Sequence, residues 1–154
     1  MTWTFAESGL ADDDVRKLLA MHFAEMRADS TPEACHVLPI DELGAPGIRF
    51  FTLRDGAGIL LCVGALKSIG PGHGEVKSMR TTPGALGLGA GGAMLRHLTE
   101  AARGMGVTRL SLETGNSLLF AAANRLYQRD GFTRCDPFGD YRDTPFTHFY
   151  TREI

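Results

Sequence analysis

The glycine-rich segment GALGLGAGGAML, residues 84–95, is the part of this sequence best suited to bind an anion. Glycine costs about 0.5–1 kcal/mol relative to alanine inside regular secondary structure, so a run of glycines indicates a backbone shape that side chains would obstruct. The segment follows a predicted strand and opens a predicted helix. Its free N–H groups and the positive end of the helix dipole would therefore face one ligand, typically a phosphate.

Three kinds of phosphate loop have this strand–glycine–helix arrangement. A nucleoside-triphosphate loop is excluded, because Ala93 follows Gly91-Gly92 where lysine and then serine or threonine are required. Gly87, Gly89 and Gly92 have the GxGxxG spacing of a dinucleotide loop, with Glu113 near the place of its ribose-binding acid. A dinucleotide loop normally lies in the first β-α-β unit of its domain, however. In this sequence a block of antiparallel strands is predicted before the glycine segment. The third kind is a pyrophosphate loop for coenzyme A.

Hydrophobic periodicity predicts the elements that position this loop. Four helices are predicted, and one of them opens at the glycine segment and ends at Gly104. The other three helices are expected at residues 12–29, 30–38 and 117–130, and strands at residues 3–8, 48–53, 59–69, 74–81, 107–114, 132–138 and 146–153. Along residues 74–81, strict alternation would put Glu75, Lys77, Met79 and Thr81 on one face and Val76, Ser78 and Arg80 on the other.

The resulting order is β-α-α-β-β-β-α-β-α-β-β. A three-strand antiparallel block followed by β-α-β predicts an α/β (α+β) fold. Its mixed, largely antiparallel sheet would be flanked by helices on both faces. The 154 residues fit one domain, residues 1–154.

Composition excludes several function classes. A net charge of -2 without a clustered basic face gives no basis for nonspecific nucleic-acid binding, and no apolar run reaches the roughly 20 residues that span a bilayer. The acidic N-terminus lacks a signal-peptide pattern, so we expect a cytoplasmic protein. Cys35, Cys62 and Cys135 are far apart, which gives no metal-site spacing, and we expect them to be buried thiols.

Two motifs give the chain a resemblance to a known family. MRTTPGALGLGAGGAMLRHL, residues 79–98, resembles the coenzyme A loop of the GNAT superfamily of N-acetyltransferases, with Gly89 and Gly91 at its last two fixed positions. Leu86 stands where that family usually has arginine or glutamine. About 35 residues downstream, AAANRLYQRDGF resembles the family element A-x-x-L-Y-x-x-x-G-F, with matches at Ala123, Leu126, Tyr127, Gly131 and Phe132.

The resemblance implies transfer of an acetyl group from acetyl-CoA to a primary amine by direct attack, with no metal. Tyr127 would be the general acid, and Glu75 the general base, with Glu113 as the second candidate. Strand 74–81 would pair its backbone with the pantetheine arm, and the departures from the family motifs make Asn116 and Asn124 candidate anchors. The cofactor-binding residues would be Met79, Arg80, Thr81, Gly87, Leu88, Gly89, Ala90, Gly91, Gly92, Asn116 and Asn124.

The acceptor is expected to be a small-molecule amine, selected by the first two helices and the last loop. Candidate substrate-binding residues are Arg27, Ser30, His36 and Tyr141. We expect His22 to be a packed, hydrogen-bonded histidine and His73 an exposed turn residue. Two alternatives stay open: a non-catalytic module that senses acyl-CoA, and a peptide or protein N-acetyltransferase. A homodimer is also compatible, because the last strand has aromatic residues on both faces.

Overall fold

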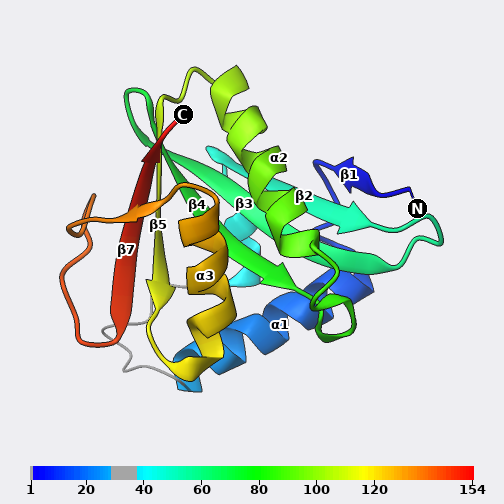
Figure 1. The fold of residues 1–154 in the computed structure, drawn as a ribbon. Coiled ribbons are helices and arrows are strands. Elements are labelled where there is room, and N and C mark those ends of the chain that lie inside the picture. Colours follow the sequence, from blue (N-terminus) through cyan, green and yellow to red (C-terminus); the bar gives the residue numbers. More distant parts are fainter. Residues whose placement is uncertain (1, 29–37) are drawn as a thin grey trace.

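A computed structural model describes residues 2–28 and 38–154, and in it one mixed sheet organises the chain (Figure 1). The strand order is β1-β2-β3-β4-β5-β7-β6, and only the β4–β5 pair is parallel. The strands are β1 (Thr4–Ala6), β2 (Ile48–Arg54), β3 (Leu60–Gly70), β4 (His73–Thr81), β5 (Arg109–Gly115), β6 (Thr133–Arg134) and β7 (Thr147–Glu153). This mixed, mostly antiparallel sheet confirms the predicted fold class.

Helices cover both faces of the sheet, as predicted (Figure 1). The α-helices are α1 (Asp13–Ala28), α2 (Ala90–Gly104) and α3 (Ala121–Arg129), with short 3-10 turns η2 (Ile40–Gly44), η3 (Pro83–Ala85) and η4 (Leu118–Phe120). On one face, Val15, Leu18 and Leu19 of α1 pack on β2 and β3. On the other face, Met94, Leu95 and Leu98 of α2 fill the main core. None of the described helices is long and apolar enough to cross a membrane.

Strands β4 and β5 are paired over only part of their length. Their parallel register covers His73, Gly74 and Glu75, and the last pair joins Glu75 to Ser111. Beyond that pair β4 runs on to Thr81 and β5 to Gly115, and the two strands spread apart (Figure 1). The sheet therefore has a V-shaped opening in its middle, where backbone groups lack a neighbouring strand.

A β-bulge in β4 lies beside this opening. Ala65 pairs with Lys77 and Val63 with Arg80, so two β4 residues face the single residue Gly64. Ser78, one of the two, has a φ of 50°, which is uncommon for a residue other than glycine. The expected strict alternation is therefore wrong beyond Lys77, because the extra residue reverses the faces.

The reversal puts charged and apolar side chains of β4 on different sides from those expected. Arg80 lies toward α1, where it pairs with Glu25. Met79 packs against the core under α2, and the hydroxyl of Thr81 lies 3.6 Å from the buried Cys62 Sγ.

Two other expectations differ from the structure or fall outside it. The predicted helix at residues 30–38 lies almost entirely outside the described residues. The predicted strand at 132–138 is reduced to the two residues of β6, although the N–H of Cys135 still donates to Phe149 O at 3.0 Å. Pro137 ends the pairing, since it has no N–H to donate.

Gly115 is the position where the fold tolerates a side chain least. A Cβ atom there would overlap the ring of the buried Phe120, the residue just before α3. We expect Gly115→Ala to lower the free energy of unfolding by about 1–3 kcal/mol, the usual cost of overpacking. Gly104→Ala is the control, because no atom lies within 4 Å of a Cβ there. Urea unfolding should show the control unchanged or stabilised by up to about 1 kcal/mol; equal losses would contradict the prediction.

Candidate active site

The opening between β4 and β5 is part of a cavity of about 610 Å³. Its walls come from four places: the end of α1, the diverging halves of β4 and β5, the glycine loop with the start of α2, and α3. Tyr141, from the segment between β6 and β7, also lines it. The cavity thus joins the anion-binding loop predicted from the sequence to Glu75, Glu113 and Tyr127.

The glycine loop presents backbone donors to this cavity. Gly87 and Gly89 have φ angles of 81° and 86°, and Gly89 caps α2 from the left-handed region. Five N–H groups between residues 87 and 92 have no acceptor among the described residues: those of Gly87, Gly89, Ala90, Gly91 and Gly92. With the helix dipole, this arrangement suits a phosphate or pyrophosphate.

Gly91 is required for a different reason, because its surroundings are close. A Cβ there would lie 3.2 Å from Leu126 Cδ2 and 3.3 Å from Thr81 Oγ1, so the glycine lets α2 approach α3 and β4. Leu86 lines the cavity with a side chain that is 66% exposed, and this side chain has no polar group. The hydrogen-bond donors that this loop offers to the cavity are therefore backbone N–H groups.

Tyr127 lies at the cavity wall and belongs to the main core. It is 6% exposed, and its ring centroid lies 6.2 Å from that of Phe132 and 6.0 Å from that of Tyr150. Burial raises the pKa of its hydroxyl above the ordinary value, so the group stays protonated at neutral pH. No described residue forms a hydrogen bond with that hydroxyl.

Glu75 is buried, not a solvated residue at a strand end. Its Oε2 accepts a hydrogen bond from the Tyr141 hydroxyl at 2.5 Å and one from Lys77 Nζ at 3.3 Å. Lys77 Nζ also donates to the Tyr141 oxygen at 2.7 Å, which closes a three-membered cluster. All bonds from described residues go to Oε2, so Oε1 keeps its acceptor capacity. Burial, followed by the charge of Glu75, raises the pKa of Tyr141.

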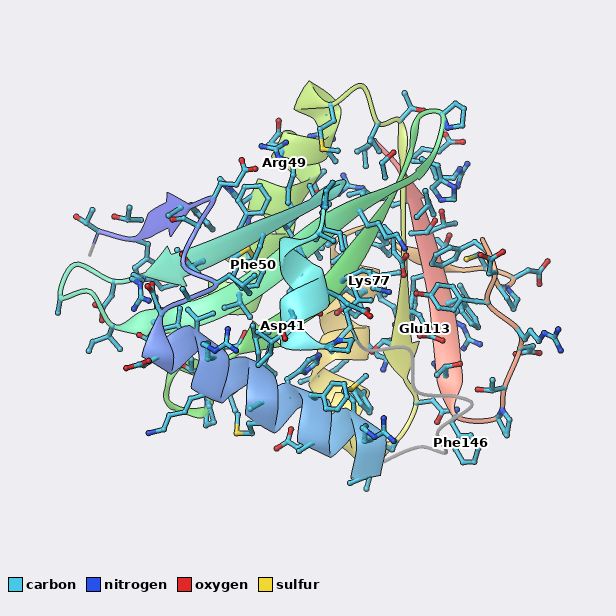
Figure 2. All side chains as sticks on the ribbon, turned by 180° about the vertical axis from the view of Figure 1, so that it is seen from behind. Asp41, Arg49, Phe50, Lys77, Glu113 and Phe146 are labelled. Carbon is cyan, nitrogen blue, oxygen red and sulfur yellow. The ribbon has the colours of Figure 1, made fainter. Side chains whose placement is uncertain are left out.

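Glu113 faces the same cavity from β5. Figure 2, the view from the α1 side, shows it on the strand beside Lys77, and both residues line the cavity. The sequence did not single out Lys77 as a site residue, because a lysine two positions from a glutamate is usually a surface ion pair. Arg129 was also missed. It ends α3 at the cavity wall, two residues after Tyr127.

His22 differs from its expectation in one respect. It is packed, with 8% exposure, but its Nδ1 has no hydrogen-bond partner in the described part of the chain. Burial, helped by the charge of Arg80 and opposed by that of Glu25, lowers its pKa from 6.5 to about 4. His73 is not an exposed turn residue, because it begins β4 and its Nε2 lies 2.7 Å from Ser111 Oγ.

Four predicted binding residues do not line the cavity. Arg27 is exposed, with its guanidinium 5.6 Å from the centre of the Phe23 ring. Leu88 points to solvent with 55% exposure. Asn116 Nδ2 donates to Pro145 O at 2.7 Å, and Asn124 Nδ2 donates to Gly115 O at the end of β5 and to Phe120 O just before α3. Both side-chain amides therefore form hydrogen bonds with backbone carbonyls. Ser30 and His36 lie outside the described residues.

The family model named Acetyltransferase (GNAT) family matches residues 13–132. The chain belongs to the GNAT family of acetyltransferases. Two uncharacterized N-acetyltransferases are similar over nearly the whole chain. YedL of Escherichia coli is 39% identical over 147 residues, 96% of this chain and 92% of the relative. YsnE of Bacillus subtilis is 39% identical over 145 residues, 94% of this chain and 95% of the relative.

A solved structure extends the comparison to three dimensions. A GNAT family acetyltransferase from Elizabethkingia anophelis with acetyl-CoA bound matches this GNAT chain with a TM-score of 0.73. The match covers 99% of this chain and 98% of that chain at 15% identity. The fold of this chain is therefore one that binds acetyl-CoA in another member of the family.

The depressed pKa of His22 predicts a pH-dependent loss of stability. The unfolded chain binds a proton at this histidine below pH 6.5 and the folded chain only below about 4, so stability falls as pH drops through that window. Between about pH 7.5 and 4.5 the wild type should lose about 2–3 kcal/mol more than His22→Phe. Urea unfolding at the two pH values measures this difference. Parallel losses would mean that His22 is protonated in the folded state.

Proposed function

We propose that this protein is an acetyl-CoA-dependent N-acetyltransferase that acts on the primary amine of a small molecule by direct attack on the thioester. One observation carries the proposal: a single cavity joins the unpaired N–H groups at the start of α2 to a protonated tyrosine and a buried carboxylate. These are the three groups that such a transfer needs, namely an anion cradle, an acid and a base.

The cofactor side of the proposal uses mostly backbone. The N–H groups of residues 87–92 would hold the pyrophosphate, and the unpaired half of β4, including Met79, Arg80 and Thr81, would pair with the pantetheine arm as an added strand does. Leu86 offers no charge. Arg129, which lines the same cavity from the end of α3, would supply positive charge that Leu86 lacks.

Tyr127 is the proposed general acid. In direct attack the amine nitrogen bonds to the acetyl carbon, the carbon–sulfur bond breaks, and the thiolate leaves more easily if it receives a proton. The buried hydroxyl of Tyr127 holds its proton at neutral pH and has no competing partner among the described residues. It can therefore donate to the sulfur.

Glu75 is the proposed general base, with Glu113 as the alternative. The attacking amine must lose a proton, and Oε1 of Glu75 is the carboxylate oxygen that Lys77 and Tyr141 leave unoccupied. Lys77 compensates the buried charge of Glu75 when no amine is present. Tyr141 holds the carboxylate in one orientation.

Tyr127→Phe tests both the activity and the acid. The wild type, with acetyl-CoA and a panel of small amines, should release thiol, and the variant should lower kcat by about 10²–10⁴-fold while acetyl-CoA binding in calorimetry is unchanged. Tyr150→Phe is the matched control, since it removes a buried hydroxyl bonded to Asn124 outside the cavity. Tight acetyl-CoA binding without turnover of any amine or peptide would instead indicate a sensing module.

Glu75→Gln distinguishes the two carboxylates. We expect a loss in kcat of at least about 10²-fold, and a smaller one for Glu113→Gln, because Glu75 has a free acceptor oxygen at the cavity. Glu75→Gln also leaves Lys77 as an uncompensated buried charge, which destabilises a protein by about 3–5 kcal/mol. The double variant Glu75→Gln/Lys77→Met restores charge balance. If it regains activity, or if Glu113→Gln costs more, Glu75 is not the base.

A further inference from the structure

Within residues 2–28 and 38–154, two buried polar atoms at the cavity have no hydrogen-bond partner. They are His22 Nδ1, from α1, and Ser78 Oγ, from the bulge in β4. An unsatisfied buried polar group costs about 1–3 kcal/mol, and native proteins contain few of them. His22 is more than nine-tenths buried, yet its ring lines the cavity. A ligand group that bonded to both side chains would remove this cost.

The charges around these two residues are already balanced. Arg80 Nη1 lies 2.5 Å from Glu25 Oε2, and Lys77 pairs with Glu75. His22 is neutral above about pH 4, because burial and the nearby Arg80 disfavour its charged form. A charged ligand group placed here would leave one charge uncompensated in a partly buried site, whereas a neutral hydrogen-bonding group would not.

The location of the two side chains points to the acceptor. His22 and Met26 line the cavity from α1 and Ser78 lines it from β4, whereas the glycine loop contributes a different part of the lining. Met26 gives this wall an apolar surface suited to a short carbon chain. The imidazole and the hydroxyl can each donate or accept, after rotation of the side chain where needed.

On these grounds, and resting on the proposed acetyl transfer to an amine, we propose that His22 and Ser78 form a subsite for a neutral polar group on the acceptor. The acceptor would then be an amine that carries a hydroxyl or a carboxamide a few carbon atoms from its nitrogen. In this proposal His22 and Ser78 determine the specificity for the acceptor. The group that they bind carries no charge.

Four amines of similar length test which terminal group the subsite accepts: propylamine, propanolamine, β-alaninamide and β-alanine. Their binding to the protein in the presence of coenzyme A is followed by the ring NMR signals of His22, assigned by their loss in His22→Phe. We expect propanolamine or β-alaninamide to shift these signals and to bind about tenfold more tightly than propylamine. The same order is expected in kcat/KM from thiol release.

Variants localise the effect. Ser78→Ala removes the hydroxyl but keeps an L-residue at the φ of 50°, so it should abolish the preference over propylamine without altering coenzyme A binding. His22→Phe should do the same in kcat/KM. Ser68→Ala, on an exposed position of β3, is the control and should keep the preference.

The outcomes separate this inference from the proposed function. If the His22 signals show the expected preference over propylamine but no thiol is released, the proposed subsite is supported and the proposed transferase activity is contradicted. Turnover with equal kcat/KM for propylamine and propanolamine would keep the transferase and reject the subsite. Tightest binding of β-alanine would also reject it, in favour of an anion site at Arg80. No shift of the His22 signals with any of the four amines overturns the inference as well.

Discussion

The separation of β4 from β5 is the constraint on which the rest of the structure depends. Two neighbouring strands in the middle of a sheet normally satisfy each other's backbone, and an unpaired polar group costs free energy when buried. Here the pairing stops at Glu75 and Ser111, and a bulge around Ser78 follows within β4. The opening is stable because the sheet continues on both sides, through β3 and β7, and because helices cover both faces.

Around this opening, polar groups from distant parts of the chain meet in small, charge-balanced sets. Glu75 and Lys77 come from β4, while Tyr141 comes from the segment before β7. Arg80 reaches across to Glu25 of α1. Each buried charge has a partner, which is the condition for keeping charges in a partly desolvated cavity. The cavity thus holds charged side chains in paired sets.

The glycine loop offers the cavity backbone donors and little side-chain polarity. Its donors are five N–H groups at the start of α2, and the exposed Leu86 adds no charge. Backbone donors are fixed by the helix and need no side-chain ordering, so they cost little conformational entropy on binding. Arg129 of α3 is among the charged residues that line the same cavity.

The sequence alone determined the fold class, the family and the place of the glycine loop before α2, because these depend on local patterns: hydrophobic periodicity, glycines before a helix and the spacing of Tyr127. It also identified Glu75 and Tyr141 individually. It did not determine that they touch, that Lys77 completes their cluster, or that Arg80 turns toward α1. Those facts follow from long-range pairing and from a one-residue bulge, which reverses every later side chain on β4. Asn116 and Asn124 show the same limit, since only the folded chain brings their amides to the carbonyls they hold.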